Sequence, residues 1–170
     1  MKVQTLTLVA AFLLAGFSLS AQEDEAKETI RYSNVTEFGF TTASPRGISL
    51  EATTAHGISI EKQHCFGLGT GIGVNFLNRN SYNYTNRTTV YMPVFFNYRL
   101  YFKPEKTFSP HVNIAVGGLV LEEGTGIYSS IAMGFKAGSF SFSSGLSFMP
   151  FCTDEWYYPF GMTLKVGFSF

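Results

Sequence analysis

The sequence predicts an all-β fold, an eight-stranded antiparallel up-and-down β-barrel. Apolar residues recur at every second position through most of the chain after residue 34, and no long stretch shows a helical period. Glycines and short polar clusters separate the alternating stretches, as they do between strands of antiparallel sheets. An even number of strands brings the chain back to the end of the barrel where it started.

The last stretch of the chain shows the alternation most completely. From Phe160 to Phe170 every even-numbered residue is apolar, and every odd-numbered residue is Gly, Thr, Lys or Ser. The predicted strands, in order, are residues 35–43, 47–60, 65–77, 90–102, 111–121, 126–136, 139–149 and 158–170. With both ends of the barrel domain on the periplasmic side, we expect turns there at 61–64, 103–110 and 137–138. The outer loops are then 44–46, 78–89, 122–125 and 150–157.

The second face of the predicted strands indicates a barrel that lies in a membrane. If this face met water, it should carry many charges, yet it consists mainly of Gly, Ser, Thr and Ala. Only 14% of the chain is charged, against about 25% in typical soluble domains. Small residues fit the crowded interior of an eight-stranded barrel. The apolar face is therefore expected to meet lipid, which makes the fold a transmembrane β-barrel without strand edges in hydrocarbon.

Composition excludes several classes of protein. Lys and Arg together number 12, as do Asp and Glu, so no basic surface suggests a nucleic-acid partner. Two cysteines, Cys65 and Cys152, are too few for a disulfide scaffold. The predicted topology places them at opposite ends of the barrel, so we expect no bridge between them.

The N-terminus predicts export. Lys2, an apolar stretch at 8–17 and the small residues up to Ala21 are typical of a cleaved signal peptide over residues 1–21. As a membrane anchor, the apolar stretch is shorter than the roughly 20 residues that a spanning helix needs. Residues 22–34 are rich in charge and are predicted to form a flexible periplasmic segment, followed by the barrel domain at 35–170.

The signal sequence, the glycine-punctuated amphipathic strands and the ending from Met162 to Phe170 together resemble a known family. They are similar to small bacterial outer-membrane β-barrel proteins of the OmpA-barrel and OmpX type, particularly the outer-membrane β-barrel or porin-family proteins of Bacteroidetes. The resemblance covers residues 35–170 and implies an integral outer-membrane protein in contact with membrane lipid. It also implies that the barrel-assembly machinery reads the terminal strand, through Leu164, Val166, Phe168 and Phe170.

Family membership of this kind does not determine an activity, because its members include structural, adhesive, transport-like and lipid-modifying proteins. Our main expectation is a monomeric, non-enzymatic barrel that contributes to envelope structure or surface interaction, with a packed lumen and no wide pore. The alternatives are a lipid-modifying barrel enzyme and a narrow passive pore. We expect neither a cofactor nor a metal.

Four charged residues fall on the small-residue face of their strands: Glu37, Glu51, Arg99 and Lys165. Buried charges must be paired, because an isolated charge is costly to bury. First and last strands are neighbours in a closed barrel, so we expect Glu37 to meet Lys165, with Glu51 and Arg99 completing a network. This network would act as an internal plug or, alternatively, as a polar path for small ions.

The remaining candidates carry weaker signals. The loop 78–89 contains Arg79, Tyr82, Tyr84 and Arg87, and it is either a candidate surface-binding loop or an ordinary solvated loop. The glycine run at 67–73 does not match a dinucleotide fingerprint and is expected to make room for large lumenal side chains. Tyrosines near strand ends, Tyr91, Tyr98 and Tyr101 among them, fit either interfacial girdles or the lumen.

Three histidines are expected in the periplasmic half: His56 on the lipid face, His64 in a turn and His111 at the start of a strand. This placement favours neither outer-leaflet catalysis nor a metal site.

Overall fold

The computed structural model describes residues 30–43, 47–77, 87–122, 124–152, 156–157 and 160–169. Within these ranges the regular structure consists of strands, and no helix is long and apolar enough to cross a membrane. The strands are β1 (Ile30–Ala43), β2 (Gly47–Ile60), β3 (His64–Leu77), β4 (Arg87–Tyr101), β5 (Phe108–Leu121), β6 (Gly124–Ala137), β7 (Phe140–Phe148), β8 (Phe151–Cys152), β9 (Trp156–Tyr157) and β10 (Phe160–Ser169).

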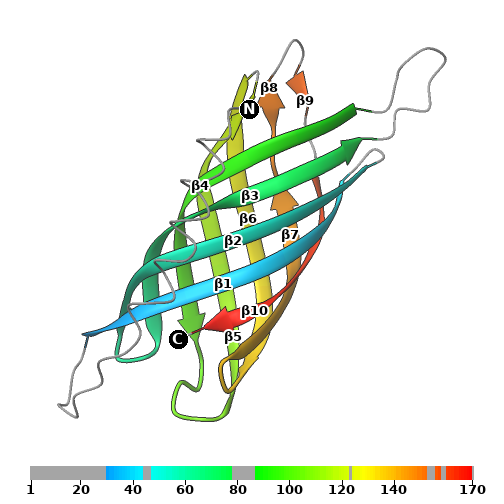
Figure 1. The fold of residues 1–170 in the computed structure, drawn as a ribbon. Coiled ribbons are helices and arrows are strands. Elements are labelled where there is room, and N and C mark those ends of the chain that lie inside the picture. Colours follow the sequence, from blue (N-terminus) through cyan, green and yellow to red (C-terminus); the bar gives the residue numbers. More distant parts are fainter. Residues whose placement is uncertain are drawn as a thin grey trace.

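Eight long strands, β1 to β7 and β10, close into an antiparallel barrel (Figure 1). Strands that follow one another in the chain pair with each other, and β1 pairs with β10 to close the circle. The predicted all-β, eight-stranded, antiparallel barrel is therefore confirmed. Closure means that backbone groups of every long strand have neighbours on both sides.

The strands are strongly tilted, because the register shifts steadily around the barrel. A path that follows paired residues from strand to strand starts at Arg31 in β1 and returns to β1 at Thr41, ten residues further along. Such a stagger requires strands inclined to the barrel axis, as Figure 1 shows. Because of this tilt, inward-facing residues that occupy different positions within their strands can lie at the same height along the barrel axis.

The expected turns lie at one end of the barrel, at residues 61–63, 102–107 and 138–139. The first is a tight turn in which the Gln63 amide donates to the Ile60 carbonyl at 3.0 Å. Its two central residues, Glu61 and Lys62, have positive φ angles of 52° and 57°. Gly138 also has a positive φ, 61°, which glycine adopts without steric cost.

Strand boundaries differ from the prediction mainly at this end. β1 begins at Ile30, so residues 30–34 are not a flexible segment: they pair with β2, from Ile30 with Ile60 to Asn34 with His56. β5 likewise begins earlier than predicted, at Phe108, and at the opposite end of the barrel β4 begins earlier, at Arg87. In each case a neighbouring strand offers backbone partners beyond the point where the apolar alternation fades, and pairing with it satisfies the backbone.

The other end carries an element that the sequence analysis placed in a loop. Within 150–157, β8 pairs with β6 and with β9 as a short hairpin, visible beyond the barrel wall in Figure 1. β8 keeps the register of β7, since Phe148 pairs with Ser129 and Phe151 with Gly126. Pro150, which has no N–H, marks the break between these two pieces of one strand.

Candidate functional site: the barrel lumen

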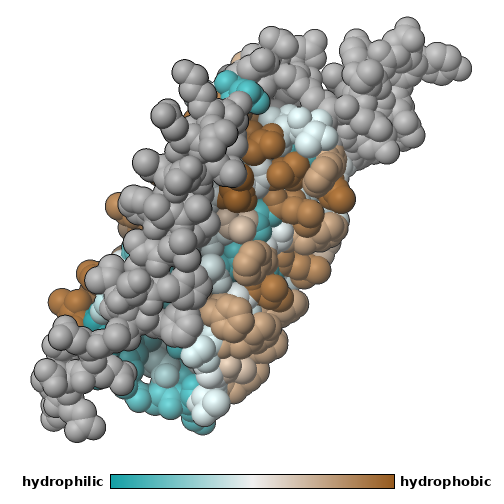
Figure 2. Space-filling model, viewed as in Figure 1, coloured by the Kyte–Doolittle hydropathy of each residue, from teal (hydrophilic) through white to brown (hydrophobic). Residues whose placement is uncertain are grey.

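The two faces of the barrel wall differ sharply in chemistry. In β10, inward residues are buried and outward residues exposed in strict alternation. All six charged residues of the long strands whose side chains are described lie on the inward side: Arg31, Glu37, Glu51, Arg99, Lys136 and Lys165. Outward positions carry large apolar side chains instead, and Figure 2 shows them as brown and tan areas over much of the visible wall, with smaller white and teal areas between them.

The first buried ion pair joins Arg99 of β4 to Glu37 of β1. The Arg99 Nη2 atom donates to Glu37 Oε1 at 2.6 Å across the lumen. Both side chains are almost fully buried, and Arg99 has no exposed surface at all. A charged hydrogen bond of this length is among the stronger interactions that a protein interior offers.

The second ion pair joins Lys165 of β10 to Glu51 of β2, with Lys165 Nζ 2.8 Å from Glu51 Oε1. Two tyrosines complete the carboxylate's shell. Tyr128 donates to Oε1 at 3.1 Å, and Tyr91 donates to Oε2 at 3.3 Å. Lys165 Nζ in turn donates to the Tyr128 oxygen at 3.0 Å, so charge and hydrogen bonding form one network.

The four charged residues thus come together, but the pairing differs from the expected one. Glu37 was expected to meet Lys165, whereas the structure joins Glu37 to Arg99 and Lys165 to Glu51. The register gives the reason. Gly39 of β1 pairs with Lys165 on one side and with Glu51 on the other, so these two side chains meet across a residue that has none.

Glycines on the lumenal face make room for this network and for the aromatic rings. A Cβ on Gly39 would lie 2.7 Å from Glu51 Cγ, too close for any side chain. In β3, a Cβ on Gly69 would overlap the Phe95 ring, and one on Gly73 would overlap the Tyr91 ring. The interpretation of the glycine run as space for large lumenal side chains is confirmed for Gly69 and Gly73, whereas a Cβ on Gly67 or Gly71 would meet the backbone of β2.

The tyrosines around Glu51 were only partly foreseen. Tyr91 and Tyr101 are buried in the lumen, while Tyr98 lies on the outward face beside Phe66. The sequence patterns above do not identify Tyr128, which is fully buried and packs against Phe95 with ring centroids 5.0 Å apart and the rings tilted by 36°. Tyr128 alternates in phase with the small residues Ser130 and Ala132, and this shared inward face is the further sequence signal that identifies it.

The three histidines do not converge. His56 is on the outward face, where it interacts with the Tyr32 hydroxyl at 2.5 Å and with Asn34 Nδ2 at 2.9 Å. His64 is the first residue of β3, not part of the turn, and bonds the Tyr98 hydroxyl at 2.9 Å. His111 is buried in the lumen. No group of three or more potential metal ligands occurs in the part of the chain that is described.

Of the other predicted site residues, some lie within the described part of the chain and some lie outside it. Leu164, Val166 and Phe168 of the expected assembly signal face outward and are exposed, and Phe170 lies outside the described residues. Arg79, Tyr82 and Tyr84 of the expected surface loop, and the predicted signal peptide, also lie outside them. Arg87 begins β4 and pairs with Leu77, but its side chain is not described.

Comparison with known proteins adds no family: no protein-family model matches this chain, and no curated protein matches it. The lumen therefore has to be interpreted from its own geometry.

Proposed function

We propose that this chain is an integral outer-membrane β-barrel protein, monomeric and non-enzymatic, that contributes to envelope structure or surface interaction. One observation carries the proposal: the wall turns its apolar side chains outward and its charges inward. Leu68, Met133 and Met162, for example, are 72%, 67% and 62% exposed. A water-soluble barrel has the opposite arrangement, because apolar area gains free energy by leaving water.

The extent of the apolar surface supports contact with lipid. Monomeric soluble proteins seldom expose a continuous apolar patch above a few hundred Å². Here exposed apolar residues occur on all eight long strands, so they surround the barrel. Closure of the sheet also meets the requirement that no backbone donor or acceptor be left unpaired in hydrocarbon.

The contents of the lumen support a packed structural barrel over a pore. Two ion pairs, two tyrosines and Phe95 connect strands that are not neighbours in the wall. Buried charges that are paired in this way favour a single arrangement of the side chains. A narrow pore and a lipid-modifying enzyme remain the competing functions, and neither has a specific observation in its favour.

Fractionation and functional assays test this proposal together. We expect the protein in outer membranes after carbonate washing, with faster migration in unboiled gels, as a folded barrel gives. Planar bilayers should show no steady conductance, and lipid A mass spectra should not change when the protein is removed. Recovery as a soluble periplasmic protein would refute membrane insertion. Steady conductance would support a narrow pore instead of a structural role, and altered lipid A would support a lipid-modifying enzyme.

Biogenesis is part of the same proposal: residues 1–21 are removed on export, and the barrel-assembly machinery recognises the strand ending in Phe170. The outward positions of Leu164, Val166 and Phe168 are compatible with such recognition. Deleting Phe170 should leave export intact and strongly reduce the heat-modifiable form in the outer membrane. Replacing Phe170 by Tyr serves as the control, because it keeps an aromatic residue; equal insertion of the deleted chain would contradict recognition of this residue.

A further inference from the structure

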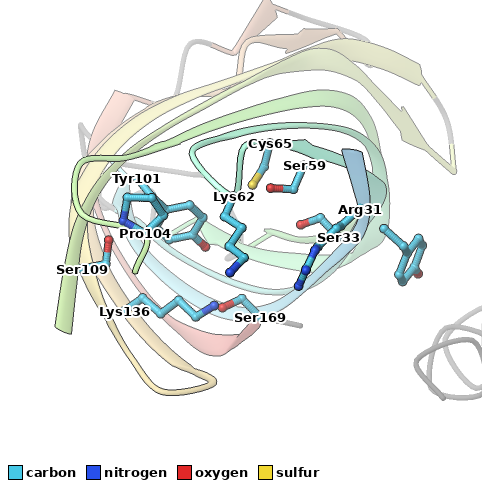
Figure 3. A pocket seen from close by; sticks show the side chains of 11 residues that line it. Arg31, Ser33, Ser59, Lys62, Cys65, Tyr101, Pro104, Ser109, Lys136 and Ser169 are labelled. Atoms are coloured by element: carbon cyan, nitrogen blue, oxygen red, sulfur yellow. The ribbon is translucent and has the colours of Figure 1, made fainter. Parts of the chain in front are cut away.

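A cavity of about 290 Å³ opens at the end of the barrel that carries the three turns. Figure 3 shows the side chains around it, which come from strand ends and turns at this end of the barrel, among them the start of β1, the turn after β2, the end of β6 and the end of β10. It is separate from the two ion pairs, since none of their four residues lines it.

The charges that line this cavity all have one sign. Arg31, Lys62 and Lys136 line it, and none of its lining residues is an Asp or Glu. Lys62 has a distant and exposed partner, Glu105, at 3.5 Å, while Lys136 lies over the Tyr101 ring at 5.5 Å from its centroid. Within the described ranges, Arg31 and Lys136 form no ion pair. Three cations around one small space produce a positive potential that favours an anion.

Uncharged donors in and near the cavity also lack partners. Ser169 lines it, is only 4% exposed, and its hydroxyl makes no hydrogen bond to any described residue. One layer deeper, His111 packs on Tyr101 with ring centroids 5.4 Å apart, and neither of its ring nitrogens has a partner in the described part of the chain. Buried polar groups are normally hydrogen-bonded, so the Ser169 hydroxyl is available to a ligand that enters the cationic cavity and accepts hydrogen bonds.

The backbone holds Lys62 in this position at a cost. Glu61 and Lys62 both have left-handed φ angles, which cost an L-residue roughly 1–2 kcal/mol each. The turn directs the Lys62 side chain toward the centre of the cavity in Figure 3. In a tight hairpin turn of this type both central residues have positive φ, so the pairing of β2 with β3 holds Lys62 in this geometry.

We propose that this cavity is a binding site for an oxyanion, a phosphate or carboxylate group held by Arg31, Lys62 and Lys136 and by the Ser169 hydroxyl. Guanidinium and ammonium groups are the side chains that bind such oxygens most strongly, through charged hydrogen bonds. The proposal rests on the cavity alone and does not depend on the membrane location or on the function proposed above.

Isothermal titration with inorganic phosphate tests the site, using the folded protein in an uncharged detergent at low ionic strength. Arg31→Gln and Lys136→Gln should each weaken binding by about tenfold, since each removes one charged hydrogen-bonding group. Lys103→Gln and Lys106→Gln are the matched controls, because they remove the same charge from a turn at the same end without touching the cavity. Gel migration without boiling establishes that every variant is folded.

The anion has two sources, a free molecule or the chain's own carboxylates. Glu23, Asp24, Glu25 and Glu28 precede β1 and, being tethered, would compete with free phosphate at high effective concentration. A second protein with these four residues changed to Gln or Asn separates the sources. Tighter phosphate binding by it than by the wild type indicates the chain's own carboxylates, and equal binding indicates a free anion. No phosphate binding by either protein, or binding that Arg31→Gln and Lys136→Gln leave unchanged, would overturn the proposal.

Discussion

At the scale of single residues, the lumen is a set of buried charges that are stable only in combination. Glu51 accepts hydrogen bonds from Tyr91 and Tyr128 and lies 2.8 Å from Lys165. Burying either charge alone would carry a desolvation cost that no remaining partner offsets. The same holds for Arg99 and Glu37, so each pair functions as a unit.

The first prediction concerns this coupling. Lys165→Met should lower the free energy of unfolding by about 3–5 kcal/mol, because it leaves the Glu51 carboxylate buried without its cation. The double variant Glu51→Gln/Lys165→Met should recover a large part of this loss. Urea titration of the folded barrel in lipid vesicles measures both effects. Lys62→Gln is the control, because its exposed pair with Glu105 should contribute no more than about 1 kcal/mol; a double variant as unstable as Lys165→Met would refute the coupling.

The second prediction concerns the fit between glycine and ring. Gly69→Ala places a methyl group on the tip of the Phe95 ring and should cost about 1–3 kcal/mol through overpacking. Phe95→Leu in the same chain should relieve part of that cost, because it removes the atoms that are overlapped. Gly118→Ala is the control, since its nearest neighbour would be 3.7 Å away. Additive effects of Gly69→Ala and Phe95→Leu in urea titration would show that the two residues do not compete for space.

At the scale of elements, alternation determines what each strand presents to the two sides of the wall. β5 illustrates this: His111, Asn113 and Ala115 are buried inside, while Val116 and Val120 are exposed outside. If the wall lies in lipid, as proposed, outward positions differ in depth along a strand. Val120 is next to the end of β5, whereas Val116 is well inside it.

The third prediction uses these two valines as a matched pair. Val116→Arg should cost about 2–4 kcal/mol, the value for arginine on the lipid face near the bilayer midplane, and Val120→Arg only about 0–1 kcal/mol. Unfolding in vesicles gives both values. The two positions have similar exposure, 54% and 49%, so a soluble protein would tolerate both equally. Equal costs would therefore contradict membrane insertion or the assigned depth.

At the scale of the whole molecule, closure and stagger decide which residues share an end of the barrel. The ten-residue shift around the circle gathers the start of β1, the turn after β2 and the end of β10 at the cavity. The hairpin of β8 and β9 stands at the opposite end. The two cysteines mark these ends, Cys65 directly after a turn and Cys152 in β8, and neither forms a disulfide.

The fourth prediction tests the orientation of the whole barrel. If the turn end faces the periplasm, as proposed, Cys152 should react on intact cells with a maleimide that cannot cross the outer membrane. Cys65, which is buried near the turn end, should not react until the envelope is opened. Mass spectrometry of labelled single-cysteine variants measures the reactivity of each thiol, and mass spectrometry of the unreduced wild-type chain tests for a disulfide between them. Labelling of Cys65 alone on intact cells would reverse the orientation, and a Cys65–Cys152 disulfide would contradict the fold.

The amino-acid sequence was sufficient to predict the number of barrel strands, the order of the turns and the inward side of four charged residues. Parity within a strand is a local property, so Glu37, Glu51, Arg99 and Lys165 could be assigned to the lumen without coordinates. The partners of these four residues, the place of Tyr128, the β8–β9 hairpin and the cationic cavity are seen only in the three-dimensional structure. These depend on the register between strands far apart in the chain. If one strand slid by two residues against its neighbour, every side chain would stay on the same side of the wall but would meet different partners. The reason is that side chains alternate between the two sides with a period of two.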